Sequence, residues 1–106
     1  MSATFYPAKQ LEPNSFTYVG EEHINLSNSN ARFILSGLGY NSSFEEHDTT
    51  KNSIDTLIAL IERYFEHDLF YQAYREREIY AYDVLNRIWI SMIKGKAKGA
   101  THWYAC

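Results

Sequence analysis

The four histidines are the residues of this 106-residue chain best suited to metal or acid–base chemistry. Zinc sites pair their ligands at short spacing, and catalytic ones often place two histidines one helical turn apart. Here Glu46-His47 and His67-Asp68 are adjacent pairs, so their side chains point in different directions. We therefore predict no metal site and no cofactor. The alternative is a small enzyme or metal-binding protein that uses neighbouring carboxylates with His23, His47, His67 and His102.

The patterns of nucleophilic catalysis are missing from the sequence. The single cysteine, Cys106, is the last residue, and no Gly-x-Ser-x-Gly elbow occurs. Gly37-Leu38-Gly39 falls at the end of a predicted helix, whereas a phosphate-binding glycine loop opens one. The acidic pairs at 21–22 and 45–46 lie in predicted loops or strand ends, where carboxylates are hydrated. We predict no catalytic residue, which favours a non-enzymatic protein.

Nucleic-acid binding is a third hypothesis. Lys94, Lys96 and Lys98 precede Trp103 and Tyr104, and aromatic rings beside basic residues can bind single strands. Lysines also stabilise the negative C-terminal end of a helix, and the chain carries a net charge of −3. The sequence therefore argues against nucleic acid as the partner.

The aromatic segment between residues 64 and 82 is the strongest indication of a binding surface. Aromatic residues make up 16% of the chain, and nine of them are tyrosines. Tyr and Arg are enriched at interface hot spots, and these rings do not all fit one inward face. We predict that the protein binds a protein partner or a second copy of itself. The predicted partner-binding residues are Tyr71, Tyr74, Arg75, Arg77, Tyr80 and Tyr82.

Hydrophobic periodicity predicts strands at 16–19 and 22–27 and a helix that begins at the Ser- and Asn-rich run 27–30. A second helix starts at Asn52 or Ser53 and buries Ile54, Leu57, Ile58, Ile61 and Phe65. A third runs from about Ile79 and buries Ala81, Leu85, Ile88 and Met92. Residues 101–105 read as a final strand, and residues 69–78 show no clear period.

These elements predict an α+β fold with a small antiparallel or mixed sheet of about three strands. The C-terminal strand returns to pair with the N-terminal ones, because unpaired backbone groups are costly, and three helices pack on one face. Residues 1–15 are predicted to be an irregular arm, and residues 16–106 a single domain. We expect a cytoplasmic protein, because the sequence shows no signal peptide and no membrane span, and a lone cysteine allows no intrachain disulfide.

The segment 24–31, Ile-Asn-Leu-Ser-Asn-Ser-Asn-Ala, followed by Leu35 and Leu38-Gly39, resembles a group of small bacterial, phage and plasmid-type proteins. In that group a short strand runs into an Asn-rich helix start. Its members also end on a helix, a turn of small residues and a strand with Trp, as residues 99–105 do here. The resemblance implies no reaction, and it favours an accessory protein of a mobile element.

Overall fold

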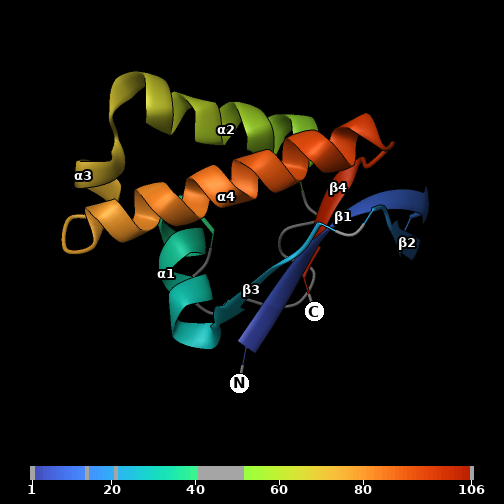
Figure 1. The fold of residues 1–106 in the computed structure, drawn as a ribbon, viewed down its shortest axis with the longest axis horizontal. Helices are drawn as coiled ribbons and strands as arrows, with labels where there is room; N and C mark the ends of the chain where they lie inside the picture. The colour runs from blue at the N-terminus through green and yellow to red at the C-terminus, as the bar shows by residue number, and fades with distance from the viewer. Residues whose placement is uncertain (1, 14, 21, 41–51, 106) are drawn as a thin grey trace.

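The structure, a computed structural model, describes residues 2–13, 15–20, 22–40 and 52–105. The elements are β1 (Ser2–Glu12), β2 (Ser15–Tyr18), β3 (Ile24–Ser27), α1 (Asn28–Gly37), α2 (Ile54–His67), α3 (Phe70–Ala73), α4 (Glu78–Ala97) and β4 (His102–Ala105). Figure 1 shows the helices on one side of the sheet, with α4 lying across β1. The predicted α+β class, with a returning C-terminal strand, is confirmed. The described sheet has four strands, and all of its pairings are antiparallel.

The prediction of an irregular N-terminal arm is wrong. Residues 2–12 form β1, the longest described strand, which pairs with the other three. The strand was not evident from the sequence, because Pro7 lies within it and its buried residues are mostly small. Pro7 is tolerated because it lacks only the N–H, while its carbonyl still accepts from Val19 N at 3.0 Å. The domain therefore includes residues 2–12.

The sheet is three strands wide around β1. Phe5 lies between Ile24 of β3 and Ala105 of β4, and Ala8 lies between Tyr18 of β2 and His102 of β4. The strands β2 and β3 therefore follow each other along one edge of β1, while β4 occupies the other edge. This register directs Ala3, Phe5 and Pro7 to the helices and Thr4, Tyr6 and Ala8 to the opposite face.

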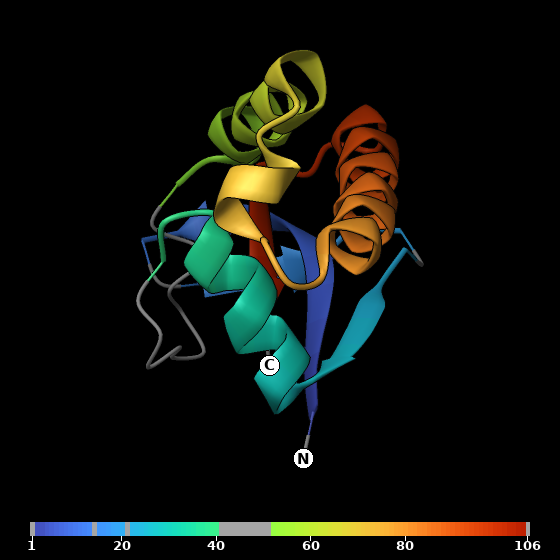
Figure 2. The same ribbon diagram turned by 90° about the vertical axis from the view of Figure 1, so that its left-hand side faces the viewer.

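The predicted helix starts are confirmed at both N-caps. The Ser27 hydroxyl accepts from Asn30 N at 3.2 Å, and the Ser53 hydroxyl accepts from Thr56 N at 3.3 Å. At the other end, Gly39 and Gly99 adopt positive φ and reverse the chain after α1 and α4. Figure 2 shows α2 and α4 as neighbouring helices above the sheet. The four-residue α3 occupies part of the segment that showed no period.

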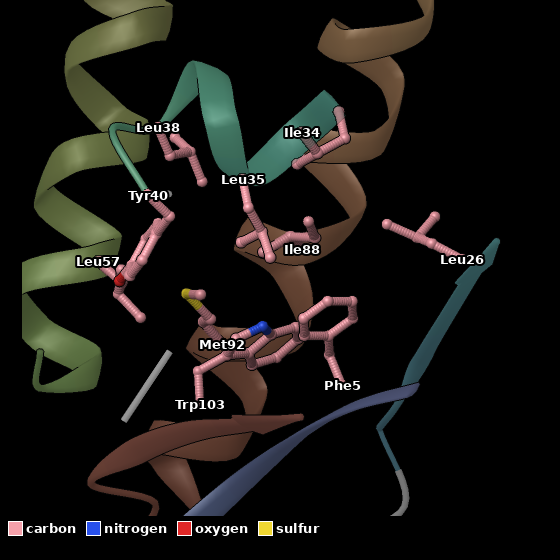
Figure 3. A pocket seen from close by; sticks show the side chains of 10 residues that line it. All are labelled: Phe5, Leu26, Ile34, Leu35, Leu38, Tyr40, Leu57, Ile88, Met92 and Trp103. Carbon is pink, nitrogen blue, oxygen red and sulfur yellow. The ribbon is translucent and has the colours of Figure 1, made fainter. Parts of the chain in front are cut away.

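The core lies between the sheet and the helices. Phe5 and Trp103 stack at 6.0 Å beneath Ile88 and Met92 of α4. This layer contains a small gap of about 10 Å³. Figure 3 shows the side chains that line it: Phe5, Leu26, Ile34, Leu35, Leu38, Tyr40, Leu57, Ile88, Met92 and Trp103. One water needs about as much space, and it would find apolar walls there. This gap is a packing feature of the core.

The described helices include none with the length and apolarity needed to cross a membrane.

Candidate functional site

The structure divides the six residues predicted to bind a partner. The prediction that Tyr74 is a surface residue is wrong, because only 1% of it is exposed. Its hydroxyl donates to the Ile34 carbonyl at 2.7 Å, and its ring meets Phe33 edge-on at 5.2 Å. Burial raises the pKa of Tyr74, with a smaller contribution from the neighbouring Tyr64 hydroxyl. Tyr74 therefore fastens the α3–α4 corner to α1.

The other five predicted residues do not form one patch. The Arg77 guanidinium lies over the Tyr80 ring at 4.1 Å and donates to Asn30 Oδ1 at 2.9 Å, so both residues face α1. Tyr82 contacts Phe70 and Phe65 from the edge of α4 nearest α2, and it remains more than half exposed. Tyr71 and Arg75 are exposed. The run of aromatics that suggested a surface is therefore largely the packing of α2, α3 and α4 against each other.

The sheet face that points away from the helices carries a second group of rings, which lie far apart in the sequence. We call this face the open sheet face. Its rings come from β1, β2, β4 and the connection before β3. This aromatic cluster consists of Tyr6, Phe16, Tyr18, His23, His102 and Tyr104. None of the described helices lies on this side of the sheet (Figures 1 and 2).

The rings of the aromatic cluster pack on one another. Tyr6 and Tyr18 stack with centroids 4.4 Å apart, and His23 approaches Tyr6 at 5.7 Å. Phe16 contacts Tyr104 at 5.5 Å and meets the His102 ring edge-on at 5.3 Å. Ala8, between the positions of Tyr18 and His102, is fully buried although it points to the open sheet face. The rings therefore form a continuous layer over the middle of the sheet.

The aromatic layer affects the protonation of His102. Burial lowers its pKa below the usual histidine value, so the imidazole is neutral at pH 7. The Thr101 hydroxyl accepts from Gln10 N and lies 2.9 Å from His102 Nδ1. That hydroxyl can donate its own proton to Nδ1 when the imidazole is neutral. The His102 end of the cluster therefore presents an uncharged ring near neutral pH.

Beyond the rings, the paired strand positions of the open sheet face are polar. Asn25 donates to the Thr4 hydroxyl at 2.7 Å and to the Ser2 hydroxyl at 3.1 Å, which makes a polar end beside the rings. The paired strand positions that share this face include no Lys or Arg; they are Ser2, Thr4, Tyr6, Ala8, Gln10, Phe16, Tyr18, Asn25, Ser27, His102 and Tyr104. The open sheet face is therefore aromatic at one end and polar at the other, while Lys9 of β1 belongs to the opposite face.

The lysines considered for nucleic-acid binding do not gather around Trp103 and Tyr104. Lys96 pairs with Asp55 of α2 on the helical side, and Lys98 lies beside Gly20 at the junction of β2 and β3. Trp103 is buried in the core beneath α4, so only Tyr104 of that pair reaches the open sheet face. Lys96 and Trp103 therefore lie on the helical side of the sheet, away from the aromatic cluster.

The histidines considered as metal ligands are also dispersed. His23 and His102 share the open sheet face, His67 is exposed at the end of α2, and His47 lies outside the described residues. Within the described ranges, no three His, Cys, Asp or Glu side chains gather closely enough to hold a metal ion.

Comparisons with protein-family models, with curated proteins and with solved structures gave no match for this chain. Its function is therefore inferred from its own geometry.

The aromatic cluster was not evident from the sequence, because its rings lie on four separate segments. One local signal was available. In the C-terminal segment 102–105, aromatic or small residues occur at every position, which is typical of a strand with rings on both faces. Assigning Tyr6 to the same face required β1, and the sequence predicted an irregular arm there.

Proposed function

We propose that this protein is a non-enzymatic docking protein that binds a partner protein through the open sheet face. The observation that carries the proposal is the layer of six rings on a sheet face that no described helix covers. Aromatic residues dominate the energetics of protein interfaces, because each offers a large contact area with few rotatable bonds.

The size of the face suits this role. A strand as long as β1 extends about 35 Å, and three strands spaced about 4.8 Å apart span roughly 15 Å with their side chains, which gives a footprint of about 500 Å². A standard interface buries about 800 Å² on each partner, so the open sheet face supplies most of one. The aromatic rings favour a partner surface that is apolar and uncharged at its centre, with hydrogen-bonding groups opposite Asn25 and Thr4.

Two other ligand classes fit the face less well. Single-stranded nucleic acid requires cations that follow the phosphates, and the paired strand positions of this face provide no Lys or Arg. A sugar would need a flat ring face that is open to it. Because Tyr6 and Tyr18 stack, each ring covers one face of the other. A protein surface can instead contact the edges and the remaining faces together.

The first experiment is affinity capture from the lysate of the source cell with three baits: the wild type, Tyr18→Ser and Tyr71→Ser. The two substitutions are matched, because Tyr18 is 52% exposed and Tyr71 is 59% exposed, and they lie at opposite ends of the molecule (Figure 1). Thermal melts first establish that each bait is folded. The partner is identified by mass spectrometry, and its binding is then repeated with purified components.

We expect a protein that the wild type and Tyr71→Ser retain and that Tyr18→Ser loses. Loss with Tyr71→Ser alone would instead support the surface predicted from the sequence. Retention by all three baits would contradict docking through the open sheet face. Capture of nucleic acid that is sensitive to Tyr18→Ser would replace the proposal with a different one. The relation to mobile-element accessory proteins stays a prediction from the resemblance alone.

A further inference from the structure

The outer side of α4 carries an apolar strip that the described part of the fold leaves uncovered. Ile79 is 87% exposed, and Ile90 and Ile93 are 39% and 40% exposed. Tyr82 forms the edge of the strip nearest α2: its ring contacts Phe65 and Phe70, and 54% of the residue is still exposed. Asn86 is half-buried and lies between them on the same side of the helix. In Figure 2 the sheet and α2 flank α4 on its inner sides, and no described element covers the outer one. Exposed isoleucines on one helix face indicate a contact with another surface.

The spacing of the residues along this strip is symmetric about Asn86. From Asn86, the positions one helical turn away are Tyr82 and Ile90, and the positions two turns away are Ile79 and Ile93. An antiparallel second α4, related by a twofold axis at Asn86, would therefore place Ile79 opposite Ile93 and Tyr82 opposite Ile90. A twofold interface requires this self-complementarity: if Ile79 of one copy contacts Ile93 of the other, then Ile93 of the first copy contacts Ile79 of the second.

Polar groups near the axis follow the same symmetry. Two Asn86 side chains at the axis can each donate an amide N–H to the carbonyl oxygen of the other, and a central Asn of this kind fixes register in paired helices. Asp83 and Arg87 are exposed on the same flank of the strip, on either side of Asn86. In the antiparallel arrangement Asp83 of one copy lies near Arg87 of the other, so opposite charges meet on both sides of the axis.

We propose that the outer side of α4 is a self-association surface, and that its occupant is α4 of a second copy of this chain, antiparallel and centred on Asn86. The strip from Ile79 to Ile93 spans about 21 Å. It is smaller than a standard interface, so the dimer is expected to be weak and concentration-dependent. This surface is separate from the open sheet face, and the dimer does not depend on the function proposed above.

A charge-pair test distinguishes this dimer from general hydrophobic association. Sedimentation equilibrium over a concentration series is measured for the wild type, Ile79→Glu, Ile93→Lys and the double variant Ile79→Glu/Ile93→Lys. The two positions are about 21 Å apart within one helix, so the new charges cannot pair inside one chain. Each single variant is expected to weaken the dimer at least about tenfold, because it places a charge against isoleucine. The double variant is expected to restore dimerisation, since each introduced carboxylate then faces an introduced ammonium group of the other copy.

Cysteine variants test the position of the twofold axis directly. In a Cys106→Ser background, Asn86→Cys is expected to form an intermolecular disulfide under mild oxidation, because residues at the axis of a close helix pair approach disulfide distance. Ile79→Cys is the control, because its own counterpart would lie about 21 Å away along the paired helices.

Cross-linking of the Asn86 variant alone supports the proposal. A monomeric wild type at every concentration overturns it, as does equal cross-linking of both variants. A dimer that survives Ile79→Glu and is lost with Tyr18→Ser would assign self-association to the open sheet face instead.

Discussion

Substitution of Gly95 by alanine tests whether β1 packs against α4. Gly95 is buried within α4, and a Cβ at this position would lie 2.3 Å from Pro7 Cβ and 2.6 Å from Pro7 Cγ. Carbon atoms in contact normally lie about 3.5–4.0 Å apart, so the helix and the central strand must separate by more than about 1 Å. The Pro7 ring cannot rotate away. Overpacking of this kind costs up to about 3 kcal/mol.

Helix propensity acts in the opposite direction. Replacing an interior glycine by alanine stabilises a helix by about 1 kcal/mol, and by less near its end. The expected net effect is therefore a loss of about 2 kcal/mol of unfolding free energy, given that overpacking cost. For a domain of this size that corresponds to a fall in Tm of roughly 8–16 °C.

Urea and thermal unfolding followed by circular dichroism measure the effect, with an unchanged m-value as the check on two-state behaviour. Ala97→Gly, at an exposed position of the same helix, isolates the propensity and should cost no more than about 1 kcal/mol. A Gly95→Ala protein as stable as the wild type, or more stable, would refute the packing of Pro7 on α4. It would restore the prediction of an irregular arm.

Two further predictions follow from the same structure. Tyr74→Phe removes the hydrogen bond to the Ile34 carbonyl and should lower the free energy of unfolding in urea by about 1 kcal/mol, because Leu38 N still donates to that carbonyl. Tyr74→Ala should lower it by about 3–5 kcal/mol. A loss below about 1 kcal/mol for Tyr74→Ala would show that Tyr74 is not a core residue. The folded-state pKa of His102 lies below the unfolded value, so the unfolded chain binds more protons and stability falls as the pH drops below about 6.5. Thermal melts of the wild type and His102→Gln from about pH 7.5 to about pH 5 should therefore show the smaller decline in the variant, and equal declines would mean that His102 is not desolvated.

The sequence was sufficient wherever a local rule determined the structure. The Ser27 and Ser53 caps and most buried positions of α2 and α4 follow from side-chain chemistry and a 3.6-residue period. Phe65 is the exception: it was predicted to be buried and is half-buried, while Tyr64 beside it is buried. Gly95 shows the limit of that reasoning. Its role is to let Pro7 approach α4, and this role depends on a strand at the other end of the chain.

The candidate site depended on long-range pairing in the same way. The sequence around Tyr74 and around Tyr71 does not distinguish a buried tyrosine from an exposed one. Only the packing of the α3 corner against α1 buries Tyr74 and leaves Tyr71 exposed. Tyr6, Tyr18 and Tyr104 meet because β1 pairs with strands from both ends of the chain. Without β1 in the sheet, no sequence rule brings these rings together.

The measurement that tests the docking proposal most directly is the affinity of the purified partner for matched tyrosine variants, determined by titration calorimetry. The proposal predicts that Tyr18→Ser weakens binding about tenfold or more, as expected of an interface hot spot, while Tyr71→Ser binds like the wild type. Equal affinity of Tyr18→Ser and the wild type, with both proteins folded, would contradict docking through the open sheet face.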